Sequence, residues 1–419
     1  MTDQSRDLAV AYLASEYPAI SHTFIEREIS MLRLEDVRVV TFTVHAANRA
    51  DLLTPTMRAE AARTRSLLDR TVGHYVRTLP RFVFGHPVAF LSGLRAAARN
   101  GAATPKAKLW QVFYLLEAIV LWYELHRERI THIHAHHANN AADIARLTVV
   151  LGRAVGRPSA PWRWTLAMHG STEFFDPEGY DLAAKVRSAD AVACISGNCV
   201  DQLRALVEED HWEKLHIVRM TVDSQTHFVP PADRRAGREG LPLRLLYVGR
   251  LFPRKGVEEI IEAAGTMVAA GRDVSVRIVG SGVLEQDLRT LVSRWDLAAR
   301  VELRGAVGQD ELPAHYQWAD VFCLPSHAEG VPVVLMEAMA SELPVVASDV
   351  GGIPELVLDG HSGVLVPAGG VAELVSAVER LDDSVPLRLR LGRNARQHVA
   401  TEFSAKVNVA RLIELVAPE

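Results

Sequence analysis

Short runs of apolar residues alternate along most of the chain with segments in which apolar positions recur at helical spacing. The apolar runs predict strands at Leu8–Leu13, Val37–Phe42, His132–Ala135, Trp164–Ala167, Ala191–Ile195, Leu243–Val248, Val274–Val279, Val321–Leu324 and Pro344–Ala347. The periodic segments predict helices, among them Phe24–Arg33, Val257–Ala270 and Leu284–Asp296. Strands that alternate with helices of about 10–15 residues are typical of βαβ units, which form parallel sheets. The predicted fold class is therefore α/β, with doubly wound, Rossmann-like sheets.

A change of composition at Phe228–Pro242 divides the chain into two parts. Pro, Gly and Arg replace the periodic pattern there, and 419 residues are enough for two domains with separate cores. We predict a Rossmann-like domain at 1–225, a linker at 226–242 and a second Rossmann-like domain at 243–400. A C-terminal helix at 401–419 is expected to pack back on the first domain. Two such domains facing each other would place ligand groups in a cleft, at the carboxyl ends of their strands.

Composition and charge narrow the class of protein. With 48% hydrophobic residues, 23% charged residues and a net charge of -5, the chain is typical of soluble globular proteins. Its cysteines, Cys194, Cys199 and Cys323, form neither a disulfide framework nor a zinc-binding spacing. The first residues lack a basic segment followed by a long apolar core, so no signal peptide is expected. These observations predict a cytoplasmic protein.

The segment 58–129 differs from the rest of the chain in charge. It holds twelve Lys and Arg against five Asp and Glu, a net charge of +7, together with several aromatic residues. Its longest apolar stretch, Leu109–Leu125, is interrupted by Gln111, Glu117 and Glu124, so no membrane span is expected. A basic, aromatic segment suits peripheral contact with the anionic inner face of the plasma membrane, although a solvated basic face over an ordinary helical core is the alternative. The acidic overall charge and the lack of a recognition motif argue against nucleic acid.

A first candidate site lies in residues 243–263, where a buried strand is followed by Arg250, Lys255 and a predicted helix. Two cations beside a helix N-terminus favour a polyanionic phosphate group. Gly249 and Gly256 allow a tight turn and close approach of the backbone to a ligand. A surface loop with solvated Arg and Lys is the alternative.

A second candidate site lies in residues 325–357. Glu329 is expected in a loop with Gly330 and Pro332, and Glu337 on a helix that begins near Pro332. A carboxylate can accept hydrogen bonds from two adjacent hydroxyls, which suits a sugar or a ribose. The alternative for either residue is a charge that stabilises the start of a helix.

Histidines gather near the ends of two predicted strands. Strand alternation would place His132, His134 and His136 on one face, which is a conceivable metal site. Because no cysteine or carboxylate lies at a suitable spacing, we expect a sugar-hydroxyl or structural role and no metal. His169 follows another strand, and by itself it would be interpreted as a core histidine.

These motifs occur in an order that resembles a known family. The matching segments are 248–256 (VGRLFPRKG), 280–282 (GSG), 305–307 (GAV), 324–340 (LPSHAEGVPVVLMEAMA) and 351–357 (GGIPELV). They resemble the donor domain of the retaining glycosyltransferases of family 4, which have the GT-B fold. The likeness covers 243–370, and residues 13–29 (LASEYPAISHTFIEREI) resemble the opening of members that build bacterial exopolysaccharides.

The resemblance implies roles for individual residues. Arg250 and Lys255 would bind the diphosphate of a nucleotide sugar, and Glu337 would hold the ribose. The other donor-binding residues would be Gly280, Gly282 and Arg304 for the nucleotide, and Glu329, Gly330, Val331 and Pro332 for the transferred sugar. Glu329, His169, Arg250 and Lys255 would form the catalytic set, with His169 contacting the sugar from the other domain. Ser21, His22, Thr23 and His136 would line the wall on the acceptor side. The family works without a metal or other cofactor and retains anomeric configuration, with Glu329 as a positioning group rather than a covalent nucleophile.

The chain departs from the family pattern at two places. His22 stands where relatives in the exopolysaccharide group usually carry an acidic residue, which bears on the donor or acceptor wall. Thr221-Val222-Asp223 replaces the family's Gly-Val-Asp near the domain junction. Neither change touches the cations or the two glutamates.

The resemblance predicts transfer of a hexosyl group from a nucleotide-diphosphate sugar to a hydroxyl acceptor. A uridine nucleotide is expected because the family most often uses it, with guanosine as the alternative. The acceptor would be a lipid-linked glycan in exopolysaccharide assembly or a soluble natural product, and a non-catalytic GT-B-like scaffold is a further alternative. A dinucleotide-dependent oxidoreductase is disfavoured, because Glu285 stands where Gly280-Ser281-Gly282 would need a third glycine.

Overall fold

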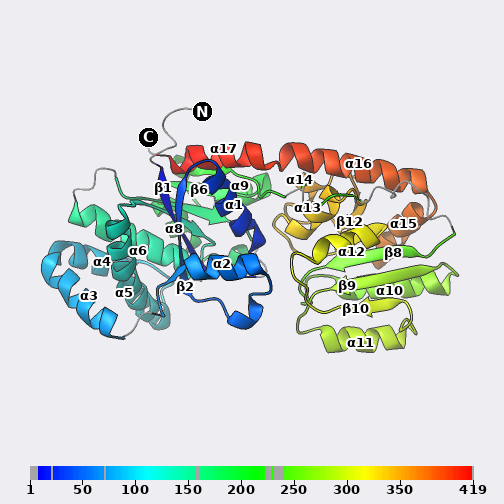
Figure 1. The fold of residues 1–419 in the computed structure, drawn as a ribbon, viewed down its shortest axis with the longest axis horizontal. Helices are drawn as coiled ribbons and strands as arrows, with labels where there is room; N and C mark the ends of the chain where they lie inside the picture. Colours follow the sequence, from blue (N-terminus) through cyan, green and yellow to red (C-terminus); the bar gives the residue numbers. More distant parts are fainter. Residues whose placement is uncertain are drawn as a thin grey trace. The chain divides into compact units, whose positions relative to one another are not determined.

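The computed structural model describes residues 8–19, 22–69, 72–156, 161–170, 172–222, 224, 228–230 and 240–417. The chain divides into two compact units, which are drawn in Figure 1. The first unit comprises Met1–Arg219 together with Asn408–Glu419, and the second comprises Met220–Val407. Most of the predicted linker lies outside the described residues.

The first unit is built on a parallel sheet of seven strands. The strands are β1 (Ala9–Glu16), β2 (Arg38–His45), β3 (Arg65–Ser66), β4 (His132–His136), β5 (Arg163–Met168), β6 (Ala191–Cys194) and β7 (Leu215–Ile217). Its helices are α1 (Thr23–Leu34), α2 (Pro55–Arg63), α3 (Val72–Gly85), α4 (Pro87–Arg99), α5 (Pro105–Glu128), α6 (Asn140–Val155), α7 (Thr172–Phe175), α8 (Leu182–Ser188) and α9 (Gly197–Arg204). The spatial order is β3-β2-β1-β4-β5-β6-β7, so the order reverses between β1 and β4. In open α/β sheets ligands bind at the carboxyl ends of the strands beside such a reversal.

The second unit repeats this plan with six strands. They are β8 (Leu243–Val248), β9 (Val274–Val279), β10 (Val301–Leu303), β11 (Val321–Leu324), β12 (Val345–Ser348) and β13 (Val364–Val366). The helices are α10 (Val257–Ala269), α11 (Glu285–Arg294), α12 (Leu312–Trp318), α13 (Val333–Ala340), α14 (Ile353–Leu356), α15 (Val371–Asp382) and α16 (Val385–Glu402). The order β10-β9-β8-β11-β12-β13 reverses between β8 and β11. The α/β, doubly wound class predicted from the sequence is thus confirmed.

The last helix, α17 (Ala405–Val416), lies mainly in the first unit. Asn408 Oδ1 accepts a hydrogen bond of 3.0 Å from the backbone N–H of Arg219. The carbonyl oxygen of Ala417 accepts one of 2.8 Å from the guanidinium of Arg163. Apolar side chains of α17, including Leu412, are buried. These contacts attach the end of the chain to the first unit.

Every strand predicted from an apolar run is present, within a few residues of the expected bounds. The strands that the pattern does not predict are β3, β7, β10 and β13, which have two or three residues each. Segments this short are not long enough to display alternation or an apolar run. They become strands because a neighbouring strand offers them a ladder of hydrogen bonds, for example Val301–Leu303 along Val276–Ile278.

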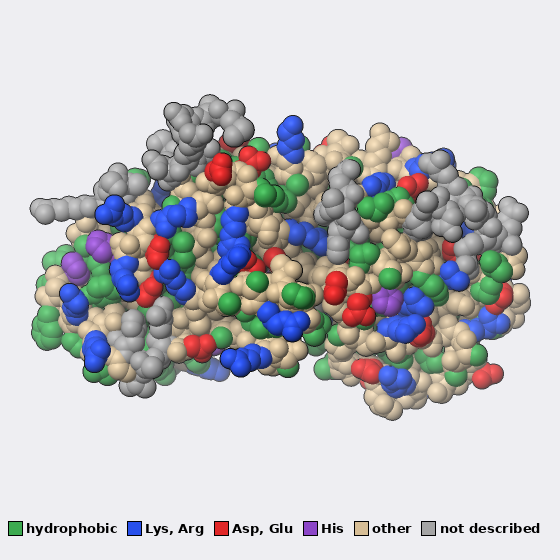
Figure 2. Space-filling view, viewed as in Figure 1, with side chains coloured by type: hydrophobic (Ala, Val, Ile, Leu, Met, Phe, Trp, Pro, Cys, Tyr) green, Lys and Arg blue, Asp and Glu red, His purple; other side chains and the backbone are tan. Residues whose placement is uncertain are grey.

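The basic segment forms the helices α2 to α5. Phe82 and Leu115 of these helices are buried, whereas Phe84, Val88 and Leu109 are 85%, 69% and 59% exposed. Figure 2 shows hydrophobic side chains beside Lys and Arg on this part of the first unit. Among the helices that the structure describes, including α5, none has the length and apolar character needed to cross a membrane.

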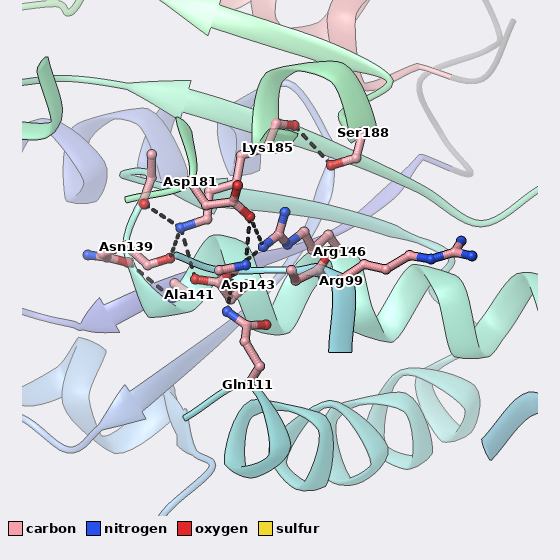
Figure 3. Close-up of polar contacts among 12 residues, drawn as sticks. Arg99, Gln111, Asn139, Ala141, Asp143, Arg146, Asp181, Lys185 and Ser188 are labelled. Atoms are coloured by element: carbon pink, nitrogen blue, oxygen red, sulfur yellow. Dashed lines mark hydrogen bonds and ion pairs between the residues drawn. The ribbon is translucent and has the colours of Figure 1, made fainter. Parts of the chain in front are cut away.

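A buried polar network joins α5, α6 and α8 (Figure 3). The carboxylate of Asp143 accepts hydrogen bonds from Gln111 at 3.0 Å and from Arg146 at 2.7 Å. Its second oxygen lies 2.8 Å from the ammonium of Lys185. Arg146 also pairs with Asp181 at 2.7 Å. Since Asp143, Arg146 and Lys185 are almost wholly buried, each charge depends on its partners for stabilisation.

Candidate active site

The two sequence blocks of the second unit meet at the carboxyl edge of its sheet. Arg250 and Lys255 lie in the loop between β8 and α10, and Glu329 lies in the loop between β11 and α13. β8 and β11 are neighbours and flank the reversal of strand order. These side chains therefore lie where open α/β sheets bind ligands.

Lys255 and Glu329 form an ion pair within this site. The ammonium Nζ of Lys255 lies 2.6 Å from Oε1 of Glu329, and the two side chains are 25% and 10% exposed. Arg250 is exposed, with its guanidinium carbon 5.1 Å from the centre of the Phe252 ring. No ion pair of Arg250 is found among the described residues. One cation is thus neutralised by Glu329, while the other presents its charge to solvent.

Glycines allow the loops of this edge to touch one another. Gly280 has a φ of +142°, and a Cβ added there would lie 1.8 Å from the carbonyl oxygen of Gly249. A Cβ on Gly282 would lie 2.2 Å from the carbonyl oxygen of Leu251, and one on Gly256 would lie 2.0 Å from that of Pro325. Contacts this short exclude any side chain. Gly280 and Gly282 therefore have a packing role at these positions, whatever further role a ligand gives them.

Glu337 is held inside the second unit rather than at its surface. It lies in the middle of α13 and is 1% exposed. The hydroxyl of Tyr316, from α12, donates a hydrogen bond of 3.0 Å to Oε2 of Glu337. This pairing could not be predicted from the sequence, because Tyr316 belongs to a different helix.

The remaining predicted donor residues are spread along the same edge. Arg304 follows β10 and its guanidinium pairs with Glu302 at 2.8 Å. The carbonyl oxygen of Gly330 accepts a hydrogen bond of 3.0 Å from the N–H of Gly352. Val331 is buried, and Pro332 is the residue that caps the N-terminus of α13, where the sequence predicted the helix to begin.

One contact at this edge was not predicted. His327 Nε2 lies 2.6 Å from Oε1 of Glu259, and its backbone N–H donates to the carbonyl oxygen of Arg254 at 2.8 Å. Both bonds connect the loop after β11 with the region after β8. His327 stands two residues before Glu329, and this proximity was the only available sign in the sequence.

In the first unit, histidines gather at the corresponding reversal of strand order. His134 and His136 lie on β4 and are fully buried. Both direct Nε2 toward Oε1 of Glu28, at 3.4 and 3.5 Å. Glu28 belongs to α1 and also accepts a hydrogen bond of 2.5 Å from the hydroxyl of Tyr12 on β1. No carboxylate lies at a suitable spacing in the sequence, as stated above, but Glu28 approaches the histidines through the fold.

His169 is joined to this cluster through His136. Its Nε2 lies 2.8 Å from Nδ1 of His136, and its ring centre lies 4.4 Å from that of Phe24. Burial, reinforced by the neighbouring His136 and His137, holds the pKa of His169 well below its usual value. His169 is therefore a neutral imidazole at neutral pH, able to donate from one nitrogen and accept at the other.

The protonation states within the cluster follow from burial and contact. Burial lowers the pKa of His136 to about 4, against the opposing effect of Glu28. Burial would raise the pKa of Glu28, but the facing rings of His136 and His134 outweigh it and hold that pKa well below its usual range. The centre is thus a carboxylate that faces the neutral ring of His136.

The other predicted residues of the acceptor side lie near the start of α1. His22 precedes α1, and its Nδ1 lies 3.0 Å from the carbonyl oxygen of Glu16. Thr23 is the first residue of α1. Ser21 lies outside the described residues, as does Asp223 of the family's junction motif. His132, on the same strand, has its Nε2 3.1 Å from the hydroxyl of Thr165.

Comparisons with known proteins identify relatives of this chain. The family model described as "Glycosyl transferases group 1" matches residues 232–398. The chain is 32% identical over 304 residues to an alpha-D-kanosaminyltransferase of Streptomyces kanamyceticus, covering 68% of this chain and 78% of that protein. It is 36% identical over 214 residues to the amylovoran biosynthesis glycosyltransferase AmsK of Erwinia amylovora, covering 49% and 51%. The chain thus spans about half the length of that relative.

The fold has matches among solved structures as well. Anabaena Alr3699/HepE, solved in complex with UDP, aligns over 97% of this chain and 98% of its own with a TM-score of 0.69 and 16% identity. At that identity the likeness concerns the fold alone. The family model and the kanosaminyltransferase relative show that this chain belongs to the group 1 glycosyltransferases, the family 4-like enzymes, and its structure has their GT-B fold.

Proposed function

We propose that this protein transfers a hexosyl group from a nucleotide-diphosphate sugar to a hydroxyl acceptor with retention of configuration. The observation that carries the proposal is the juxtaposition of Arg250, Lys255 and Glu329 at the switch point of the second sheet. An exposed guanidinium and a paired ammonium in one loop suit a diphosphate, and the carboxylate paired with that ammonium suits the hydroxyls of the attached sugar.

In the proposed mechanism the two cations bind the diphosphate and the carboxylate of Glu329 positions the sugar. Arg250 and Lys255 bind the diphosphate and offset the negative charge that grows as the glycosyl bond breaks, so no metal is needed there. Lys255 exchanges Glu329 for phosphate, and the released carboxylate orients the sugar. The bond between C1 and the phosphate oxygen breaks while C1 bonds to the acceptor oxygen on the same face, and the departing phosphate takes the acceptor's proton. In the same proposal Glu337 serves the ribose, and His169 contacts the sugar.

The identity of the donor and the acceptor is proposed from relatives. We favour a uridine nucleotide, because Alr3699/HepE was solved with UDP. For the acceptor we favour a growing polysaccharide, in keeping with the amylovoran relative. The alternative is a soluble natural-product acceptor, and the alpha-D-kanosaminyltransferase is matched over a larger share of this chain than the amylovoran relative.

A membrane-bound acceptor would also explain why apolar side chains are exposed on α3 to α5. Phe84 and Val88 project from this face among basic residues, a pattern that suits anionic lipid at the inner surface of the plasma membrane. The test is sedimentation with phosphatidylglycerol vesicles. We expect Phe84→Glu and Val88→Glu to reduce binding, and equal binding to neutral vesicles would contradict the proposal.

The donor proposal is tested by nucleotide binding before any acceptor is known. We expect one of UDP, GDP, ADP and TDP to raise the melting temperature of the full chain, with calorimetry giving its affinity, and the effect to persist in EDTA. Arg250→Ala should abolish that shift. Arg289→Ala, which removes an exposed arginine of α11, is the matched control. No shift with any nucleotide would favour the non-catalytic scaffold.

A further inference from the structure

The centre of the histidine cluster contains buried polar atoms that lack hydrogen bonds. The Nε2 atoms of His134 and His136 have no hydrogen-bond partner among the described residues, although both rings are 0% exposed. Both atoms point to Oε1 of Glu28, at 3.4 and 3.5 Å, and the three atoms lie within 4.8 Å of one another. A buried polar atom without a partner costs about 1–3 kcal/mol, so this arrangement calls for a bound group.

The spacing distinguishes the kinds of group that could satisfy these atoms. A direct N–H···O hydrogen bond would be about 2.9–3.0 Å long, shorter than either distance. A bridging water at about 2.8 Å from each atom would hold tetrahedrally placed partners about 4.6 Å apart. A tetrahedral metal ion at about 2.0–2.1 Å holds its ligands about 3.3–3.4 Å apart. The two distances to Glu28 match the metal ion.

The second ring nitrogens and the carboxylate have the supporting contacts that metal ligands usually have. Nδ1 of His134 lies 2.6 Å from the hydroxyl of Thr165, and Nδ1 of His136 lies 2.8 Å from Nε2 of His169. A proton on each Nδ1 leaves the Nε2 lone pair free for an ion. The hydroxyl of Tyr12 holds Glu28 at 2.5 Å. Such outer contacts fix the tautomer and the orientation of ligating side chains.

We propose that Glu28, His134 and His136 bind one divalent transition-metal ion of the zinc type. Two imidazoles and one carboxylate form a ligand set that zinc uses, with a fourth position left for water or substrate. The ligands join β4 to α1 at the switch point of the first sheet. This ion is separate from the donor diphosphate, for which the cations of the second unit suffice, and the inference does not depend on the proposed transferase activity.

The test measures metal and not turnover. The full chain is stripped with EDTA, reloaded with zinc sulfate and freed of unbound zinc by gel filtration, and its zinc content is measured by mass spectrometry. We expect one ion per chain, and visible absorption bands of tetrahedral cobalt when Co²⁺ is added instead. Glu28→Gln keeps the size of the side chain and should weaken zinc binding by about tenfold or more.

A matched control uses the next histidine along the chain. His137 bonds Glu173 at 3.3 Å and is not one of the three ligands, so His137→Gln should bind zinc like the wild type. Circular dichroism checks that each variant folds. If Glu28→Gln does not fold, the proposal is tested by whether zinc raises the melting temperature of the stripped wild-type chain. A stripped wild-type chain that neither retains zinc nor melts higher in its presence would overturn the proposal, as would equal binding by wild type and Glu28→Gln.

Discussion

The ion pair between Lys255 and Glu329 makes a prediction that separates nucleotide binding from sugar positioning. Nζ and Oε1 lie 2.6 Å apart, and we expect a bound diphosphate to draw Lys255 away from its carboxylate. Lys255→Met and Glu329→Gln both remove this pair. Their effects on nucleotide binding should nevertheless differ. Lys255→Met removes the side chain that binds the phosphate, whereas Glu329→Gln removes the carboxylate that competes with the phosphate for Lys255.

The size of each effect follows from the contacts. A hydrogen bond to a charged group contributes about 1.5–3 kcal/mol, so Lys255→Met should weaken the nucleoside diphosphate by about 10- to 150-fold. It also leaves Glu329, whose side chain is 10% exposed, as an unpaired negative charge beside the phosphates. Glu329→Gln frees Lys255 and should leave affinity unchanged or strengthen it, while turnover falls because the sugar is no longer oriented.

Calorimetry with the nucleoside diphosphate found in the screen measures the first effect, and steady-state turnover of the sugar nucleotide measures the second. The double variant Lys255→Met/Glu329→Gln completes a cycle that gives the coupling energy of the pair. If Glu329→Gln weakens nucleotide binding as much as Lys255→Met does, Lys255 does not exchange between the two partners. The division of roles would then be wrong.

Three further predictions concern stability and packing. Asp143→Asn leaves Lys185 without its main partner and should lower the free energy of unfolding by roughly 3–5 kcal/mol in urea titration. Burial raises the pKa of Glu117 to about 7, so the native chain holds a proton there that the unfolded chain loses near pH 4.5, and stability falls as pH rises from about 4.5 to about 7. Glu117→Gln should therefore stabilise the protein at pH 8 and have little effect at pH 4.5. Gly280→Ala should abolish nucleotide binding and lower the melting temperature, since its Cβ meets the carbonyl oxygen of Gly249.

Controls for these variants exist in the same chain. Asp201→Asn removes an exposed ion pair and should change the unfolding free energy little. Gly271 has a φ of +83° with no atom near its Cβ, so Gly271→Ala reports backbone strain without a clash. A stability gain from Glu117→Gln that is the same at both pH values would contradict the assigned pKa. Equal losses from Gly280→Ala and Gly271→Ala would show that strain, and not contact between the loops, explains the glycine.

The sequence predicted those features whose cause is local. An apolar run such as Leu243–Val248 makes a strand wherever two helical layers cover it, and it appears at those residues. Gly256 precedes α10 with a φ of +65°, as a glycine before a helix suggested. The order of strands and loops then brings the residues after β8 and β11 together, so the Lys255 and Glu329 blocks could be identified without knowledge of the contact between them.

Contacts between segments that are distant in the sequence could not be predicted from local patterns. Glu28 reaches His134 from a helix more than a hundred positions away, and Tyr316 reaches Glu337 from a neighbouring helix. In both cases one partner is a helix residue that no local spacing in the sequence links to the other. The role of that residue depends on which face of its helix packs on the sheet. Hydrophobic periodicity predicts that a helix packs against a sheet, but it does not predict which polar residue lies at the edge of the contact.

The strand order, which is similar in both units, explains why the candidate functional side chains lie in the loops after particular strands. In each unit the chain runs outward from a central strand, returns past it, and continues on the other side, so the loops after β1 and β4, and after β8 and β11, diverge to opposite faces. That divergence leaves space at the carboxyl edge for polar groups that packing would otherwise exclude. In the second unit Arg250, Lys255 and Glu329 occupy this place, and in the first unit the carboxylate and imidazoles around His136 do. If both proposals hold, the same topology provides an anion-binding edge in one unit and a cation-binding edge in the other, and the side chains at the edge decide which ion binds.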